Sequence, residues 1–118
     1  MDRERYWIRE IQKRRSPEAG NQLIKKYYRE IYGYVYKQCF NRELAMDLTQ
    51  EIFLSLLKSI EDYDASRSSF RTWLYRIATN RIVDYYRSRY YRYTQIKEPL
   101  EEAQLQSGED FTLQIETK

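Results

Sequence analysis

The sequence predicts an all-α fold, a small bundle of three to four helices followed by an acidic, linker-like tail. Only 3 Gly and 2 Pro occur in the 118 residues, so few positions interrupt helices. Apolar residues recur at helical spacing through most of the chain, whereas the alternation that marks strands is rare before residue 94. A chain of this length suits one domain with a modest core.

The first two helices are indicated by their ends as well as by their apolar residues. A short helix is expected over residues 3–14, before Ser16 and Pro17 restart the chain. Ser is a good N-cap, and Pro fits the first helical position because its missing N–H would have no partner there. We expect the second helix to run to about Cys39. Its apolar face comprises Leu23, Ile24, Tyr27, Tyr28, Ile31, Tyr34 and Val35.

Two more helices are expected in the second half of the chain. Asn41 suits the N-cap of a third helix, which ends near Ile60. Residues 61–69 form a polar loop that is rich in the turn-prone residues Asp and Ser. A fourth helix starts near Phe70 and continues past Arg89.

Charge divides the chain at about residue 94. Residues 1–93 hold 19 of the 21 Lys and Arg residues and 12 of the 18 Asp and Glu residues, a net charge of +7. Residues 94–118 hold the other 2 basic and 6 acidic residues, a net charge of −4, with a faint strand signal at Phe111, Leu113 and Ile115. We therefore predict a domain over 1–93 with a polyanion as its partner. An ordinary solvated surface would also account for this charge.

Several classes of function lack the residues that they need. Cys39 is the only cysteine and the chain has no His, so a disulfide within the chain is excluded and the usual zinc sites lack ligands. Without His, paired thiols or a glycine-rich phosphate loop, we expect no catalytic site, no cofactor and no metal. No apolar run approaches the roughly 20 residues that span a bilayer, so no membrane insertion is expected. The charged N-terminus MDRERYW has no signal-peptide core, which predicts a cytoplasmic protein.

The third helix has more apolar residues than one core-facing stripe requires. Its continuous stripe comprises Leu44, Ala45, Leu48, Ile52, Leu56 and Ile60. A second apolar set lies beyond that stripe, bordered by Asp47, Gln50 and Glu51, and consists of Met46, Phe53, Leu54 and Leu57. Polar residues around an exposed apolar strip are typical of a specific protein interface. We therefore predict a docking surface here, and the alternative is that the first helix and the tail cover it.

The fourth helix combines arginines with aromatic residues. Its expected core stripe is Phe70, Leu74, Ile77, Ala78, Ile82 and Tyr85, and an adjoining face carries Trp73, Arg76, Asn80, Asp84 and Arg87. Residues 81–93 add Arg81, Arg89 and Arg92 with five tyrosines. Arginine supplies charge for phosphates, and aromatic rings stack on unpaired bases. We predict a surface for nucleic acid with exposed bases, in which Asn80 could read a base edge and Asp84 orients a neighbouring Arg. An amphipathic helix with solvated arginines is the alternative.

The position of the loop before the fourth helix favours the binding of a phosphate and a base. Free backbone N–H groups and the helix dipole favour phosphate at the start of a helix, which Ser68 or Ser69 can cap. The side chains of Ser66, Arg67, Ser68 and Ser69 are able to line a pocket for an extruded base.

Two stretches resemble region 2 of bacterial RNA polymerase sigma factors of the extracytoplasmic-function (group IV, sigma-70 family) type. The pattern A-x-D-x-x-Q-E-x-F is present at Ala45, Asp47, Gln50, Glu51 and Phe53. The pattern F-x-x-W-L-x-x-I-A-x-N-x-x-x-D-x-x-R is present at Phe70, Trp73, Leu74, Ile77, Ala78, Asn80, Asp84 and Arg87. The likeness covers about residues 23–92, and both patterns in this order make it specific.

The resemblance implies a non-enzymatic role in transcription initiation. In such factors the first stretch docks on the clamp helices of the largest catalytic subunit of core RNA polymerase, and an anti-sigma factor is a further expected partner. The implied polymerase-binding residues are Asp47, Gln50, Glu51, Phe53, Leu54 and Leu57.

The second stretch and the loop before it are implied to bind the promoter −10 element. In the family the loop holds a flipped base, and the helix helps to melt the duplex and to hold the non-template strand. The implied DNA-binding residues are Tyr63, Ser66, Arg67, Ser68, Phe70, Arg71, Trp73, Arg76, Asn80, Arg81, Asp84, Arg87 and Arg89.

The chain departs from the family pattern after residue 93. Complete factors of this type carry a region 4 domain that reads the −35 element, and nothing in residues 94–118 supplies its helices. We expect these residues to be an acidic interdomain linker, which puts autonomous promoter selection in doubt. Two other functions stay open, a helix-turn-helix regulator that reads duplex DNA and a helical protein-interaction module.

Overall fold

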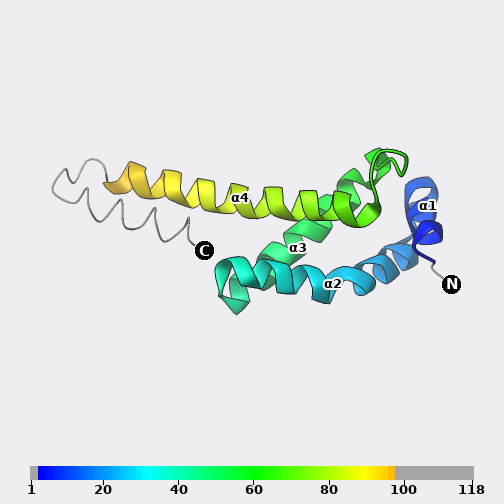
Figure 1. Ribbon diagram of the computed structural model, residues 1–118, viewed down its shortest axis with the longest axis horizontal. Coiled ribbons are helices and arrows are strands. Elements are labelled where there is room, and N and C mark those ends of the chain that lie inside the picture. Colours follow the sequence, from blue (N-terminus) through cyan, green and yellow to red (C-terminus); the bar gives the residue numbers. More distant parts are fainter. Residues whose placement is uncertain (1–2, 98–118) are drawn as a thin grey trace.

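The computed structural model describes residues 3–97, and every regular element in this part of the chain is helical (Figure 1). The order is α1 (Glu4–Arg14), α2 (Pro17–Cys39), α3 (Arg42–Ser59), a 3₁₀ turn η1 (Ile60–Asp62) and α4 (Phe70–Lys97). The predicted all-α bundle is confirmed, and its helix boundaries lie within a few residues of the expected ones.

The fourth helix is longer than the charge pattern indicated. It continues through Thr94, where the tail was expected to begin, and ends at Lys97. The helix therefore crosses the predicted domain boundary at 93/94, and that boundary stays a prediction. The faint strand signal at residues 111–115 lies outside the described residues.

Side-chain caps begin three of the helices. The Ser16 Oγ accepts a hydrogen bond from the Ala19 N–H at 3.1 Å, and the Asn41 Oδ1 accepts one from the Leu44 N–H at 2.9 Å. The Ser69 Oγ accepts from the Thr72 N–H at 3.2 Å, which decides between the two predicted caps of α4. Each cap satisfies a backbone donor that the first turn of a helix leaves free.

The core lies where α3 packs against both α2 and α4 (Figure 1). The central side chains have no more than 1% of their surface exposed, namely Leu23, Ile31, Val35, Ala45, Ile52, Leu56, Ile60, Leu74 and Ala78. α1 packs on α2 and η1 and contributes Ile8 and Ile11 to this core. Cys39 is buried as expected, with its thiol donating to the Asn41 carbonyl at 3.5 Å.

The two halves of α4 have different surroundings. Among residues 70–95 of this helix, Ile82 is the last buried one, and the following turns carry the exposed side chains of Val83, Tyr90 and Tyr91. In Figure 1 this second half projects beyond α2 and α3. The core thus fixes the direction of α4 through its first half only.

Candidate protein and nucleic-acid interfaces

A polar surface with an apolar centre lies on the side of α3 that points away from the core. Asp47, Gln50, Glu51 and Leu54 are all exposed on this side, and we name them the docking face. Leu54 has 58% of its surface exposed, in contrast to Ile52 and Leu56, which are buried on either side of it in sequence. The docking face therefore pairs one large apolar side chain with a polar border.

The predicted second apolar set of α3 is smaller than expected. Phe53 is only 5% exposed, because α2 covers it and the Tyr28 ring stacks on it with 6.0 Å between centroids. Leu57 is half-buried and packs on the Gly20 side of α2, where its Cδ2 lies 3.7 Å from the place of an added Cβ. The prediction that Phe53 and Leu57 belong to an exposed face is corrected, since the long α2 reaches further around α3 than the helical wheel indicated. Met46 and Leu54 remain exposed.

The arginine-bearing surface of α4 is present as the wheel predicted. Arg76, Asn80, Asp84 and Arg87 are exposed along it, and with the half-buried Trp73 they form what we name the basic face. Within residues 3–97, neither Arg76 nor Arg87 makes an ion pair or a side-chain hydrogen bond. Asp84 likewise pairs with no arginine in this range, so the expectation that it orients one is wrong.

Trp73 has a packing role that the wheel did not reveal. Its ring lies 5.1 Å from that of Tyr63 and 5.9 Å from that of Phe70, measured between centroids. The three rings form an aromatic cluster in which Phe70 is 2% exposed and the other two are half-buried. This burial argues against direct DNA contact by Phe70, whose ring supports its neighbours. Trp73 presents a partly exposed ring that is held in place.

The loop before α4 is ordered by its own polar groups. The Asp64 carboxylate accepts hydrogen bonds from both the N–H and the hydroxyl of Ser66, at 2.9 and 2.8 Å, and these bonds lower the pKa of Asp64. The Tyr63 hydroxyl donates to the Ser68 carbonyl at 2.9 Å, and burial raises the pKa of Tyr63. The Arg67 side chain is exposed and has no hydrogen bond within residues 3–97. The loop therefore has a defined shape at the head of α4.

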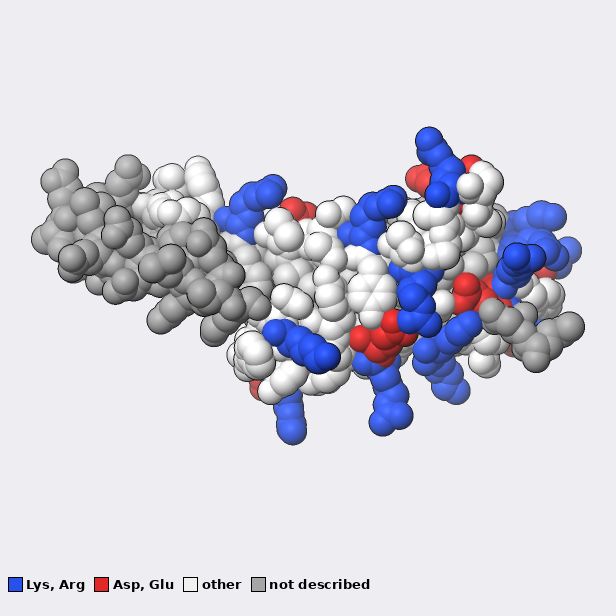
Figure 2. Space-filling model, viewed as in Figure 1, with Lys and Arg blue, Asp and Glu red and all other residues white. Residues whose placement is uncertain are grey.

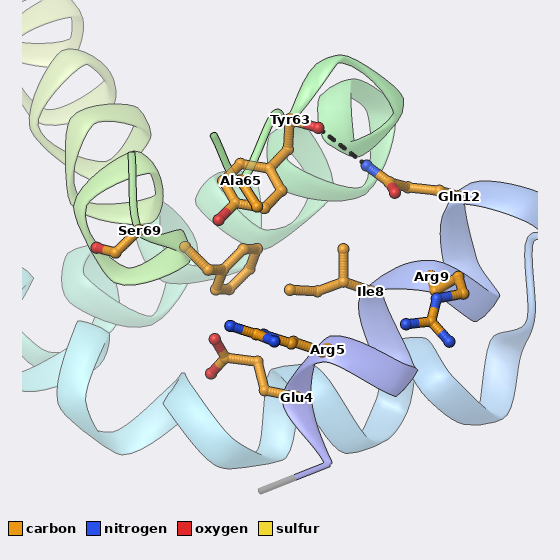
Figure 3. A pocket seen from close by; sticks show the side chains of 9 residues that line it. Glu4, Arg5, Ile8, Arg9, Gln12, Tyr63, Ala65 and Ser69 are labelled. Carbon is orange, nitrogen blue, oxygen red and sulfur yellow. Dashed lines mark hydrogen bonds between the residues drawn. The ribbon is translucent and has the colours of Figure 1, made fainter. Parts of the chain in front are cut away.

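A cavity of about 580 Å³ lies between this loop, the start of α4 and α1 (Figure 3). The loop and α4 contribute Tyr63, Ala65, Ser69 and Phe70, whereas Ser66, Arg67 and Ser68 do not line it. The remaining lining residues come from α1 and are Glu4, Arg5, Ile8, Arg9 and Gln12. Sequence reasoning predicted a pocket in this loop but missed the contribution of α1. The spacing of Arg5 and Arg9, which places them on one side of a helix, was the available signal.

Gln12 ties α1 to the loop. Its side-chain amide donates to the backbone carbonyls of Ile60 at 2.8 Å and of Tyr63 at 3.1 Å. Two acceptors on the same group fix the orientation of this amide. The distance between α1 and the loop, and thus the width of the cavity, depends on this contact.

Two of the predicted DNA-binding arginines are occupied by acids of neighbouring helices. Arg71 pairs with Glu30 of α2, and this contact raises the pKa of Arg71. Tyr75 donates to the same carboxylate at 2.8 Å, and burial together with this hydrogen bond raises the pKa of Tyr75 to about 12. Arg81 pairs at 2.8 Å with Glu51, which belongs to the docking face. The docking face and the arginines of α4 are therefore joined by one ion pair.

Neither a candidate metal site nor a candidate membrane span is found within the part of the chain that the structure describes. No group of three or more His, Cys, Asp or Glu within residues 3–97 is placed to hold a metal ion. No helix in that range is both long and apolar enough to cross a membrane.

Several curated proteins that are similar to this chain are named RNA polymerase sigma factors. RNA polymerase sigma factor YlaC of Bacillus subtilis (strain 168) is 36% identical over 75 residues, which are 63% of this chain and 43% of the relative. ECF RNA polymerase sigma factor SigW of the same organism is 36% identical over 72 residues, 61% of this chain and 38% of the relative. ECF RNA polymerase sigma factor SigE of Mycolicibacterium smegmatis is 33% identical over 71 residues, 60% of this chain and 27% of the relative. The matched part spans less than half the length of these curated relatives.

The family described as Sigma-70 region 2 matches residues 23–91. This range covers more than half of the chain and includes the docking face, the loop and the basic face. The chain therefore belongs to the sigma-70 region 2 family, in the extracytoplasmic-function group that its motifs predicted.

Proposed function

We propose that this chain acts in transcription initiation as a sigma factor domain, which binds core RNA polymerase through the docking face and promoter −10 DNA through the basic face. The observation that carries this proposal is that α3 and α4, packed against each other, expose two surfaces of different chemistry. Membership of the sigma-70 region 2 family and the names of the relatives support it. The role is non-catalytic, because the domain acts by binding.

The docking face suits a helical protein partner. Leu54 supplies an exposed apolar centre, while Asp47 and Gln50 provide the polar border that fixes the register of a specific interface. We propose the clamp helices of the largest polymerase subunit as this partner. An anti-sigma factor that occludes the same surface would be a second partner.

The basic face suits the non-template strand after the duplex has opened. Arg76 and Arg87 have no side-chain partner within residues 3–97 and can meet phosphates, and the partly exposed Trp73 ring offers a platform for an unpaired base. Stacking of this kind contributes about 1–3 kcal/mol per base. Flipping a base costs a few kcal/mol, so the lone domain should bind DNA weakly, and polymerase binding should supply the remaining free energy.

A helix-turn-helix regulator is disfavoured by the connection between α3 and α4. That motif joins its two helices by a turn of about 3–4 residues, whereas here η1 and residues 63–69 separate α3 from α4. A simple protein-interaction module would leave unexplained the unpaired arginines on the basic face.

Two binding measurements test the proposal. In a pull-down against core RNA polymerase, Leu54→Arg should abolish retention of the chain, and Val83→Arg is a matched control because Val83 is an exposed apolar residue of α4. Retention of the Leu54 variant at the level of the control would move the interface elsewhere. Fluorescence anisotropy should show tighter binding to a single-stranded −10 oligonucleotide than to its duplex, and the reverse preference would support the helix-turn-helix alternative.

A further inference from the structure

We propose that α1 completes the base-binding site, with Arg5 and Arg9 contacting backbone phosphates of an unpaired nucleotide whose base enters the cavity beside Tyr63. This inference rests on the proposed function and extends its DNA site to a helix outside the matched residues 23–91. It assigns to α1 a part in recognition beyond its packing on α2 and η1.

The size and lining of the cavity suit a nucleobase. Its volume of about 580 Å³ exceeds that of a single base, and the half-buried Tyr63 ring forms an aromatic side, supported by the Phe70 ring at 5.5 Å between centroids. Polar side chains of the lining come from α1 and include Arg5, Arg9 and Gln12. An aromatic surface together with a few polar groups is how proteins hold a base outside the stack.

Charge at the mouth of the cavity favours an anion. Arg5 and Arg9 line it from α1, and both are exposed and form no ion pair or side-chain hydrogen bond within residues 3–97. Glu4 is the one acid in the lining, and it is engaged by the Lys26 ammonium at 2.8 Å and by the Tyr27 hydroxyl. Figure 2 shows Lys and Arg side chains gathered at the end of the molecule that holds α1. A nucleotide brings both an anionic phosphate and a base to such a site.

Gln12 holds the two walls together. Its amide bonds to the carbonyls of Ile60 and Tyr63 keep α1 against the loop, as the dashed contact in Figure 3 shows for Tyr63. The arginines therefore stand at a fixed distance from the aromatic wall. Gln12 is a positioning residue in this arrangement, because it acts through the loop.

Two single-stranded DNA probes distinguish affinity that comes from phosphate contacts from affinity that comes from base contacts. The first probe is an 11-nucleotide oligothymidine, and the second is an abasic strand with the same phosphates and no bases. The double variant Arg5→Ala/Arg9→Ala should lose about tenfold in affinity for both strands. Its salt slope should fall by about 1.4, because each phosphate contact on a single strand contributes about 0.7.

Two further comparisons complete the experiment, a control double variant on α1 and a variant that fills the cavity. Lys13→Ala/Arg14→Ala removes the same charge from α1 without touching the cavity lining, and should lose much less affinity. Ala65→Phe fills the cavity and should weaken binding of oligothymidine while sparing the abasic strand, whereas Asn21→Phe adds a ring at an exposed position of α2 outside the lining.

Equal losses in the two α1 double variants would overturn the inference, because only overall charge would then matter. An Ala65→Phe variant that binds oligothymidine like the Asn21→Phe variant would overturn the base-binding role of the cavity. Both results leave the proposed function standing. A wild-type chain that prefers duplex to single strands would instead contradict the proposed function itself.

Discussion

The docking face and the basic face lie on adjacent helices, but the bundle holds their side chains differently. On α3, Leu54 is an exposed apolar residue of a helix whose opposite side is buried. On α4, Trp73 is braced by Tyr63 and Phe70, whereas Arg76 and Arg87 extend into solvent without partners in the described residues. The proposed function therefore relies on apolar burial at the docking face, and on a packed ring with exposed arginines at the basic face.

This difference predicts different responses to salt. Apolar burial is insensitive to moderate ionic strength, whereas binding of phosphates by arginine weakens steeply as salt rises. Polymerase binding should therefore persist under conditions in which DNA binding by the isolated chain is lost. A factor built in this way would hold DNA firmly only when polymerase has already brought it to the promoter.

Replacing Trp73 should give the largest difference between the effect on DNA binding and the effect on polymerase binding. Trp73→Ala removes a stacking platform, so affinity for a single-stranded oligonucleotide should fall by about 1–3 kcal/mol, roughly 5- to 150-fold. Retention on core polymerase should be unchanged, because Trp73 lies on α4 and is not part of the docking face on α3. Anisotropy titrations measure the first effect and pull-downs the second.

Trp73→Phe is the control for lost packing in the aromatic cluster, since it keeps a ring against Tyr63 and Phe70. It should retain most of the affinity. If Trp73→Ala binds single strands as well as the wild type does, the basic face does not use this ring.

Gln12→Ala should affect the loop without affecting the docking face. The substitution leaves the carbonyls of Ile60 and Tyr63 without their side-chain donor, which costs about 1–2 kcal/mol of unfolding free energy. Urea denaturation followed by circular dichroism measures this loss. Gln22→Ala, at an exposed position of α2, is the matched control and should be neutral. An unchanged midpoint for Gln12→Ala would show that the loop keeps its position without α1.

The helical pattern and capping residues of the sequence were sufficient to predict the fold. Ser16 and Asn41 are local signals, because a cap bonds a backbone group only three residues away. The same holds for the basic face, whose members lie on one side of one helix. Local periodicity determines both features, so no knowledge of tertiary contacts was needed.

Features that depend on contacts between distant segments could not be predicted in this way. A wheel of α3 treats Phe53 and Leu54 alike, and only the path of α2 decides that Tyr28 covers Phe53 while Leu54 stays exposed. The ion pair of Arg81 with Glu51 and the contact of Gln12 with Ile60 likewise join residues of different elements. The loop pocket was predicted from nearby serines, but its second wall is α1, more than fifty residues earlier in the chain.

The exposed arginines of the basic face should account for much of the salt dependence of its binding to single-stranded DNA. Arg76→Ala/Arg87→Ala should reduce the salt slope for single-stranded DNA by about 1.4, which corresponds to about sevenfold less change in affinity between 50 and 200 mM salt. Arg29→Ala/Lys37→Ala removes two exposed charges from α2 and is the matched control. A slope that falls equally in both variants would show that these arginines contribute only through net charge.

The ion pair between Glu51 of the docking face and Arg81 of α4 should have the smallest effect. Both side chains are between two-fifths and half exposed, so solvent screens their attraction, and a double-mutant cycle on unfolding free energy should give a coupling of about 0.2–1 kcal/mol. The cycle consists of Glu51→Ala, Arg81→Ala and the double variant. When polymerase contacts Glu51, Arg81 gains freedom to meet a phosphate, so Arg81→Ala should weaken DNA binding more in the polymerase complex than in the isolated chain. An equal effect in both states would show that the ion pair ties the two helices together but does not link the two surfaces in binding.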